Sequence, residues 1–152
     1  MSDLERIRNW LHKYPEINKI GALKVDYYAA QPNNGSIDPS GLVEISRTND
    51  ILGNVTVENQ YNFGLYFVLA KAPDDDKGAK DNADWLLDFQ RWIQEQSILQ
   101  NVPVFGDVPE YETITAQNGK VEAADEEGTG IYSVQLSITF TKIYEVNEYG
   151  EN

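Results

Sequence analysis

The residues able to carry chemistry are few in this chain, and no combination of them forms a recognisable catalytic set. His12 is the only histidine and the chain has no cysteine, which excludes thiolate nucleophiles, disulfides and sites with several histidine ligands. His12 ends an amphipathic run beside Lys13, where a cation favours the negative end of a helix dipole. We expect a capping or surface role for His12, because no nucleophile-elbow motif accompanies it.

The acidic run Asp74, Asp75 and Asp76 suggests calcium, which prefers oxygen ligands. An EF-hand loop that starts at Asp74 would place Trp85 at the position where a bidentate glutamate is required, so the motif fails. We expect a solvated acidic loop at residues 73–81. With 25 acidic residues in the chain, a suitably spaced carboxylate pair has no specificity for glycosidic chemistry, and the glycines form no phosphate-binding pattern. The sequence predicts no enzyme, no cofactor and no metal site.

Charge is divided unevenly along the chain. Residues 1–73 carry 8 acids and 7 bases (net −1), residues 74–152 carry 17 acids and 5 bases (net −12), and the whole chain carries −13. Such a field repels nucleic acid phosphates and anionic lipid. The longest apolar run, residues 65–70, is far shorter than the roughly 20 residues that cross a bilayer, and the charged N-terminus lacks a signal core. We therefore predict no specific nucleic acid binding and no membrane partner.

Apolar residues recur at helical spacing in two runs. The first follows Ser2, with Glu5 as a capping-box partner, and ends before Tyr14. The second runs from Asn82 to about Gln100. Its broad apolar stripe, suited to lying across a sheet, contains Trp85, Phe89 and Trp92. The spacing predicts that these aromatic residues are core rather than a ligand cage.

Alternating apolar and polar residues predict the strands. The run Tyr61–Leu69 becomes apolar on both faces, which favours a central strand. The run Ile131–Val146 would span about 53 Å, so we expect it to bend or to reach beyond its domain. Shorter strands are predicted at 22–29, 42–46, 55–57, 111–117 and 120–124. The last two flank Asn118-Gly119, which predicts a type I′ hairpin turn, whereas residues 31–41 are dense in turn formers and predict a long exposed loop.

The order of these elements predicts an α+β fold, with a mostly antiparallel β-sheet and two main helices packed on it. One domain is expected over residues 1–146, followed by a flexible C-terminal tail at 147–152. The residues expected to pack in the core are Trp10, Phe63, Phe67, Trp85, Phe89, Trp92, Leu136 and Phe140.

Five segments, taken in order and spacing, resemble a known family. They are FGLYFVLAKA at 63–72, NADWLLDFQRWIQEQ at 82–96, VPVFGD at 102–107, AQNGK at 116–120 and YSVQLSITFTKIYEV at 132–146. Together they resemble the minor capsid proteins of tailed bacteriophages and prophages of Gram-positive bacteria. That family is similar to phage tail terminators, also called tail completion proteins. The resemblance covers residues 55–146.

This resemblance implies a structural virion protein with a tail-terminator-like fold, made in the bacterial host cytoplasm. It implies a homo-oligomeric ring of six subunits at the head-proximal end of the tail, which joins the tail tube protein to the head connector protein. DNA would pass through the lumen without specific binding. An acidic lumen would repel phosphates, so on this expectation the acidic loops lie in the lumen or on a ring face. The acidic residues concerned are Asp74, Asp75, Asp76, Asp125, Glu126 and Glu127.

Other functions stay open at this stage. Neck and head completion (connector) proteins are also small and ring-forming. An acidic inhibitor that mimics DNA is a candidate of another class, although it would need acids at near-phosphate spacing, whereas here they cluster in predicted turns. An unrecognised hydrolase is a third candidate.

Overall fold

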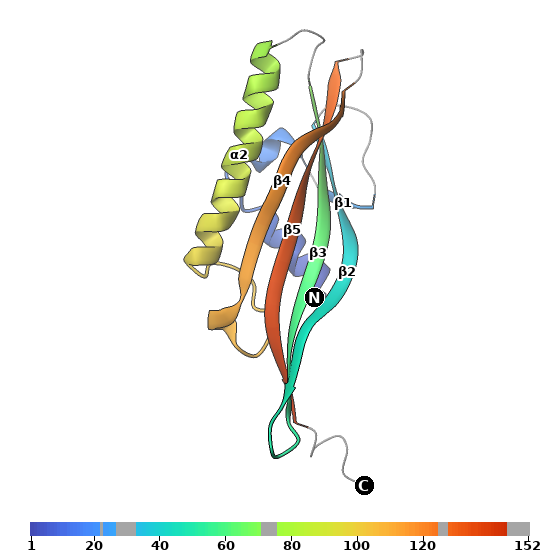
Figure 1. Cartoon of the computed structure of the whole chain (residues 1–152). Helices are drawn as coiled ribbons and strands as arrows, with labels where there is room; N and C mark the ends of the chain where they lie inside the picture. Colours follow the sequence, from blue (N-terminus) through green and yellow to red (C-terminus); the bar gives the residue numbers. More distant parts are fainter. Residues whose placement is uncertain (22, 27–32, 71–75, 125–127, 146–152) are drawn as a thin grey trace.

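The computed structural model of the chain describes residues 1–21, 23–26, 33–70, 76–124 and 128–145, without the side chains of Asp76, Ala123 and Ala124 (Figure 1). Two α-helices, two short 3-10 helices and five strands follow one another along these residues. In chain order they are α1 (Asp3–Leu11), η1 (Ile17–Lys19), β1 (Leu23–Val25), β2 (Asn34–Asn49), β3 (Val55–Ala70), α2 (Asp76–Ile98), η2 (Pro109–Tyr111), β4 (Thr113–Ala124) and β5 (Thr129–Tyr144).

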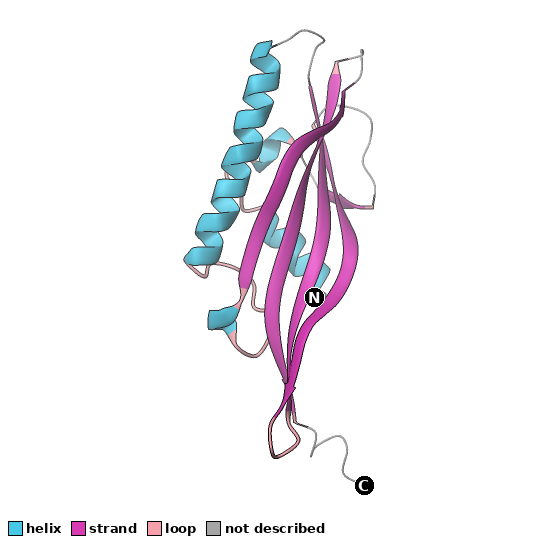
Figure 2. Cartoon of the chain, viewed as in Figure 1, coloured by secondary structure: helices cyan, strands magenta, loops and turns pink. Residues whose placement is uncertain are grey.

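The five strands form one sheet in the order β1-β2-β3-β5-β4. Only the short β1 runs parallel to its neighbour, and every other pair is antiparallel. The predicted α+β class with a mostly antiparallel sheet is therefore confirmed (Figure 2). The prediction that residues 61–69 form a central strand is also confirmed, because β3 lies third in the order.

Both α-helices pack on one face of the sheet. The Phe67 ring of β3 lies 5.2 Å from the Trp85 ring and 5.5 Å from the Phe89 ring of α2, measured between ring centroids. Tyr14, just after α1, contacts Phe89 at 5.1 Å. The two helices also touch each other, since the rings of Trp10 and Trp92 stack at 5.1 Å. Aromatic side chains therefore join the two helices and the sheet into one core.

The predicted core residues lie in this cluster. Seven of them are buried, and Trp92 is partly buried and packs against the others. The buried seven are Trp10, Phe63, Phe67, Trp85, Phe89, Leu136 and Phe140.

The first helix begins as predicted, because the Ser2 hydroxyl accepts a hydrogen bond from the Glu5 backbone N–H at 3.2 Å. The predicted start of the second helix is wrong. It begins at Asp76, six residues before Asn82, so most of the expected loop at 73–81 is helical. Lys77 and Lys80 pair with acids one turn later, which stabilises these exposed turns. Asn82 is instead buried, and its amide donates to the Ala70 carbonyl at 2.8 Å.

The predicted long loop at 31–41 is also wrong from Asn34 onward, where β2 begins. Gly35 serves close packing rather than a turn, because a Cβ there would lie 3.0 Å from the side chains of Ile20 and Leu23. Pro39 lies beyond the last residue that pairs with β1, at an edge where its missing N–H costs no ladder hydrogen bond. Residue types that usually form turns are therefore tolerated in β2, Gly35 because of close packing and Pro39 because of its position at the edge.

The predicted hairpin turn at Asn118-Gly119 is a β-bulge within one continuous strand. Gln117 lies opposite Gln135 and Lys120 lies opposite Ser133, so β4 holds one extra residue here. Asn118 has a positive φ of 58°, which a bulge can require as well as a type I′ turn. The Asn118-Gly119 dipeptide therefore correctly predicted a positive φ. The strand nevertheless continues, because the residues before and after this dipeptide both pair with β5.

The three central strands extend beyond the rest of the sheet. β4 begins at Thr113, opposite Thr139, whereas β2, β3 and β5 continue for about five more residues. We call this extension, residues 44–59 and 140–144, the arm; it forms the lower end of the molecule in Figure 1. The last strand, β5, runs over Thr129–Tyr144 and pairs with β3 along its whole length, so it extends past β4 but stays within the sheet rather than reaching beyond its domain.

Candidate functional site

His12 caps α1, in agreement with its predicted role. Its Nδ1 lies 2.8 Å from the Arg8 carbonyl oxygen, and its Nε2 accepts the backbone N–H of Leu23 at 3.3 Å. These contacts require the tautomer with the proton on Nδ1. The ring therefore ties the end of the helix to the start of β1, and both of its nitrogens are occupied by backbone groups.

The acidic loops expected at a ring surface fall largely outside the described residues. Asp74, Asp75, Asp125, Glu126 and Glu127 are not described, and of Asp76 only the backbone at the start of α2 is. Three other acids of α2 have identified partners. Asp81 and Asp84 pair with lysines of the same helix, and Asp88 accepts the Tyr14 hydroxyl at 2.5 Å.

Tyr14 and Tyr61 each hydrogen bond to a carboxylate of another element. Burial, followed by the hydrogen bond to Asp88, raises the pKa of Tyr14. Burial and the hydrogen bond to Asp3, at 2.6 Å, raise the pKa of Tyr61 to about 12. Both hydroxyls act as donors that hold an α-helix to its neighbours, so their role is structural.

A hollow of about 660 Å³ lies beside the stacked pair Trp10 and Trp92, with Arg6 and Lys13 among its lining residues. Arg6 is already engaged by Asp3 at 3.3 Å and by the Val104 carbonyl, and it lies over the Phe105 ring. The Trp10 indole donates to the Asn101 carbonyl at 2.9 Å. These polar groups hold the helices and the 101–105 segment together, so the hollow is a packing seam rather than a ligand site.

The face of the sheet opposite the helices carries a regular array of small polar side chains. We call it the open face. Four consecutive cross-strand rows, read from β2 through β3 and β5 to β4, occupy its middle. They are Ser36-Tyr66-Ser133-Lys120, Asp38-Gly64-Gln135-Gln117, Gly41-Asn62-Ser137-Thr115 and Val43-Gln60-Thr139-Thr113.

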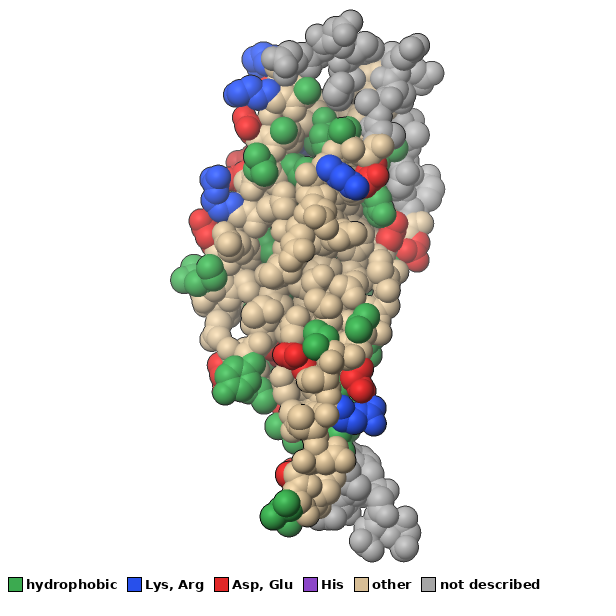
Figure 3. Space-filling view, in the orientation of Figure 1, with side chains coloured by type: hydrophobic (Ala, Val, Ile, Leu, Met, Phe, Trp, Pro, Cys, Tyr) green, Lys and Arg blue, Asp and Glu red, His purple; other side chains and the backbone are tan. Residues whose placement is uncertain are grey.

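These rows contain one acid, Asp38, and one base, Lys120, although the whole chain carries −13. Figure 3 shows the same face with uncharged polar atoms through its middle and charged side chains near its margins. Hydroxyl and amide groups thus leave these four rows without net charge on a strongly acidic protein, with Glu122 beside Lys120 as a further acid of the face.

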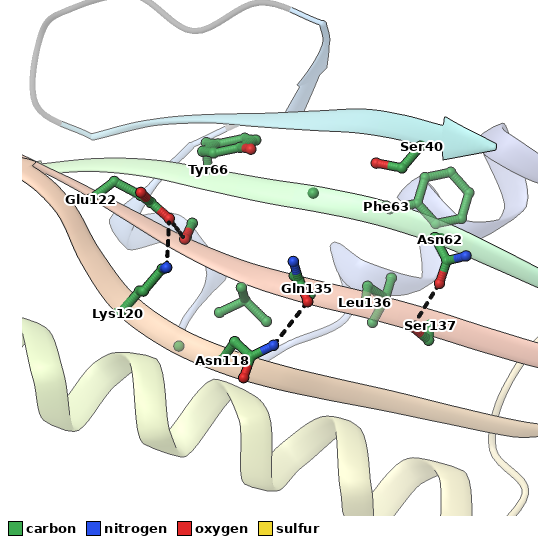
Figure 4. A pocket seen from close by; sticks show the side chains of 14 residues that line it. Ser40, Asn62, Phe63, Tyr66, Asn118, Lys120, Glu122, Gln135, Leu136 and Ser137 are labelled. Carbon is green, nitrogen blue, oxygen red and sulfur yellow. Dashed lines mark hydrogen bonds and ion pairs between the residues drawn. The ribbon is translucent and has the colours of Figure 1, made fainter.

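The polar groups of the open face hydrogen bond to one another. A hollow of about 410 Å³ on this face lies between β3, β5 and the bulge of β4 (Figure 4). Within it, Asn118 donates to the Gln135 amide oxygen at 2.8 Å and Ser137 donates to Asn62 at 2.9 Å. The hydroxyl of Ser133 donates to Glu122 at 2.6 Å.

Glu122 is the one carboxylate drawn in Figure 4, and two neighbours stabilise its charge. The Ser133 hydrogen bond is the first cause that lowers the pKa of Glu122, and Lys120, at 3.6 Å, adds to it. No imidazole lies beside Ser133, because the only histidine of the chain, His12, lies on the helix side of the sheet. The arrangement suits a polar surface in which several side chains hydrogen bond to their neighbours.

The arm and the part of β2 that leads into it expose several apolar side chains. Residues Pro39–Asn49 of β2 are all exposed, including Leu42, Val43 and Ile45. At the tip, Ile51 is fully exposed and Leu52 is 69% exposed. Exposed apolar groups gathered in one projecting element mark an interaction surface more often than a free surface.

The tip is a preformed turn. The Asp50 carboxylate accepts the backbone N–H groups of Leu52 and Asn54, both at 2.9 Å. The Gly53 N–H also donates to the Asp50 carbonyl at 3.1 Å. The turn therefore presents Ile51 and Leu52 without leaving its own donors unsatisfied.

The sequence analysis missed the arm and its tip. One signal was present: residues 42–49 do not alternate between apolar and polar, which indicates a strand that buries neither face. Glu112 was missed as well. It is 5% exposed and accepts the N–H groups of Phe105 and Gly106 at 3.1 and 2.7 Å, which holds that loop against the end of β5.

Among the described residues, no group of three histidine, aspartate or glutamate side chains is placed to hold a metal ion. No helix in the described part of the chain is both long and apolar enough to span a membrane. Comparison with known protein families finds no match, and no curated protein sequence matches the chain.

Proposed function

We propose that this protein is a structural subunit of a tailed phage or prophage virion, acting as a tail terminator or minor capsid protein. It would form a ring, expected to hold six subunits, at the head-proximal end of the tail. There it would join the tail tube protein to the head connector protein. The observation that carries the proposal is the neutral open face, which an acidic subunit presents together with a projecting arm.

A channel for DNA needs a wall that does not hold phosphates. A basic wall would bind them with a strength set by the number of neutralised charges. The open face offers one base and one acid in its four central rows, and four of its amide and hydroxyl side chains are hydrogen bonded in pairs, Asn118 with Gln135 and Ser137 with Asn62. The net charge of −13 adds a repulsive field around it. We propose that the open face lines the channel of the ring.

The arm supplies the second requirement, which is a contact that reaches outside the subunit. Ring closure needs heterologous contacts, in which two different surfaces of the same chain meet. An exposed apolar hairpin on a rigid three-stranded support is suited to such a contact, or to a contact with the next protein of the tail or head. Three acids of α2, Asp81, Asp84 and Asp88, pair with lysines or with Tyr14, which argues against a DNA mimic.

The test is a tail-length measurement in a phage from which the gene has been deleted. We expect tails of uncontrolled length that do not join heads, and rescue when the gene is supplied in trans. Uniform tails that fail only at joining would favour a neck or head completion protein instead. Normal virions would overturn both proposals. A double variant, Ile51→Asp with Leu52→Asp, tests the tip of the arm in the same assay. It should fail to assemble into virions. Its thermal stability should be retained, because both side chains are exposed.

A further inference from the structure

The two outer edges of the sheet differ in how they are protected. The edge of β4 is covered by α2: the Ile114 N–H donates to the Ser97 hydroxyl, and the Gln90 amide donates to the Ala116 carbonyl, both at 3.0 Å. The edge of β2 pairs with β1 only over Gly35–Ile37. Beyond it, no described strand or side chain covers Pro39–Asn49, which we call the free edge.

The free edge holds two of the features that limit pairing with another chain, Pro39 and two β-bulges, but other such features are missing. It contains no lysine, and its apolar residues Leu42, Val43 and Ile45 are 56, 48 and 47% exposed. Its only charged residues are Glu44 and Arg47, so the segment is neutral within a chain of −13. Open strands with exposed apolar groups and little charge are templates for a further strand. A strand from outside the subunit is therefore expected to cover it.

The β-bulge between Glu44 and Ser46 determines the charge pattern of this edge. Residues three apart in a regular strand point to opposite faces, but the extra residue places Glu44 and Arg47 on the same face. They form an ion pair at 2.7 Å and line one shallow hollow together. If two such edges lie antiparallel about an axis between Ile45 and Ser46, Glu44 of each falls opposite Arg47 of the other.

We propose that two copies of this chain pair through their free edges in an antiparallel, two-fold arrangement centred between Ile45 and Ser46. The pairing is self-complementary, as an isologous contact must be, because each acid meets the base of the second copy. A second copy is favoured over an unrelated peptide because, in this register, the ion pair that Glu44 and Arg47 form within each chain can be exchanged for two such pairs between the chains. The ring proposed above needs head-to-tail contacts, so the pairing describes the free subunit before it joins a virion, and it does not rest on the proposed function.

The first experiment reverses one charge at a time and measures association by sedimentation at ordinary salt. Glu44→Lys makes the edge wholly positive and Arg47→Glu makes it wholly negative, so each variant alone should dissociate about tenfold more readily. An equimolar mixture of the two should associate at least as well as the unaltered protein. Glu58→Lys, on the central strand of the arm, is the matched control with the same change in net charge and should associate normally.

The second experiment uses the absence of cysteine in the chain. In the proposed register Val43 lies opposite Thr48 of the second copy, and a mixture of Val43→Cys and Thr48→Cys proteins should form a mixed disulfide on oxidation. Both charges of the edge are retained in these variants. A mixture of Val43→Cys and Ser46→Cys proteins should form no mixed disulfide, because Ser46 is displaced by two residues from the position opposite Val43 and lies beyond disulfide reach.

The outcomes separate this proposal from the proposed function. An unaltered protein that stays monomeric, single variants that associate as it does, or a mixture that fails to associate would each overturn the pairing. Association without the Val43–Thr48 cross-link would also overturn it, and would point to another surface. The tail-length result is independent of all of these, since it is measured in virions.

Discussion

The helix α2 provides a graded test of the packing described here, because three of its apolar residues differ in burial. Phe89 is fully buried, Trp92 is partly buried, and Leu87 is 59% exposed. Truncating each to alanine removes apolar side-chain atoms from the same helix at nearly neutral cost in helix propensity. The free energy of unfolding should therefore fall in the order of burial rather than of side-chain size.

The structure sets the size of each effect. Phe89 contacts Tyr14, Phe67 and Trp85 at centroid distances of 5.1, 5.5 and 5.6 Å, so Phe89→Ala leaves a cavity among aromatic rings. We expect a loss of about 3–5 kcal/mol. For a domain of this size that corresponds to a fall in melting temperature of roughly 6–20 °C. Leu87→Ala should change stability by less than about 0.5 kcal/mol.

Trp92→Ala should fall between the two. The indole loses its stacking on Trp10, worth about 0.5–1.5 kcal/mol beyond area burial. Part of its surface is already in water, so the total should be about half of the Phe89 value. Urea unfolding followed by circular dichroism measures all three variants under one condition. A Trp92→Ala loss equal to or above that of Phe89→Ala, or a Phe89→Ala loss below about 1 kcal/mol, would refute this account of the core.

Two further predictions concern alkaline pH and backbone packing. Tyr61 has its pKa raised to about 12 by burial and by its hydrogen bond to Asp3, whereas the unfolded value is about 10. The unfolded chain therefore loses this proton first. The stabilisation from the Tyr61 hydroxyl is complete below about pH 10 and is lost as pH rises through about 12. The melting-temperature difference between the unaltered protein and Tyr61→Phe should shrink over that range, and a constant difference would contradict the assignment. Gly106→Ala should destabilise by about 1–3 kcal/mol, because a Cβ there would lie 2.2 Å from the Thr141 carbonyl oxygen. Gly119→Ala is the control and should reduce stability less, because the atom nearest to a Cβ at Gly119, at 2.3 Å, is the amide oxygen of the movable Gln90 side chain. Equal thermal shifts for the two variants would show that the backbone contact at Gly106 is not decisive.

Periodicity was sufficient for the parts of the fold in which a residue's neighbours in sequence determine its environment. The α+β class, the first helix with its Ser2 cap, the central position of β3 and the aromatic stripe of α2 all follow from patterns that repeat every 3.6 or 2 residues. The core residues follow for the same reason, since an amphipathic element buries its apolar face wherever it lies.

The errors share a different cause, because each depends on a partner that is distant in sequence. Asn118-Gly119 carries the same preference for positive φ in a turn and in a bulge, and only β5 on both sides of it decides for the bulge. Asn34 and Gly35 read as loop residues, yet β1 and β3 enclose them in the sheet.

The candidate surfaces also emerge only in three dimensions. The neutral open face combines residues from four strands, none of which is unusual alone. The free edge exists because α2 covers β4 while nothing described covers the second half of β2. Sequence alone therefore determined which residues are apolar, where the charge lies and which catalytic groups are absent. Tertiary pairing decided which polar residues share a face and which edge is left open, because register and neighbours are long-range properties that no local pattern records.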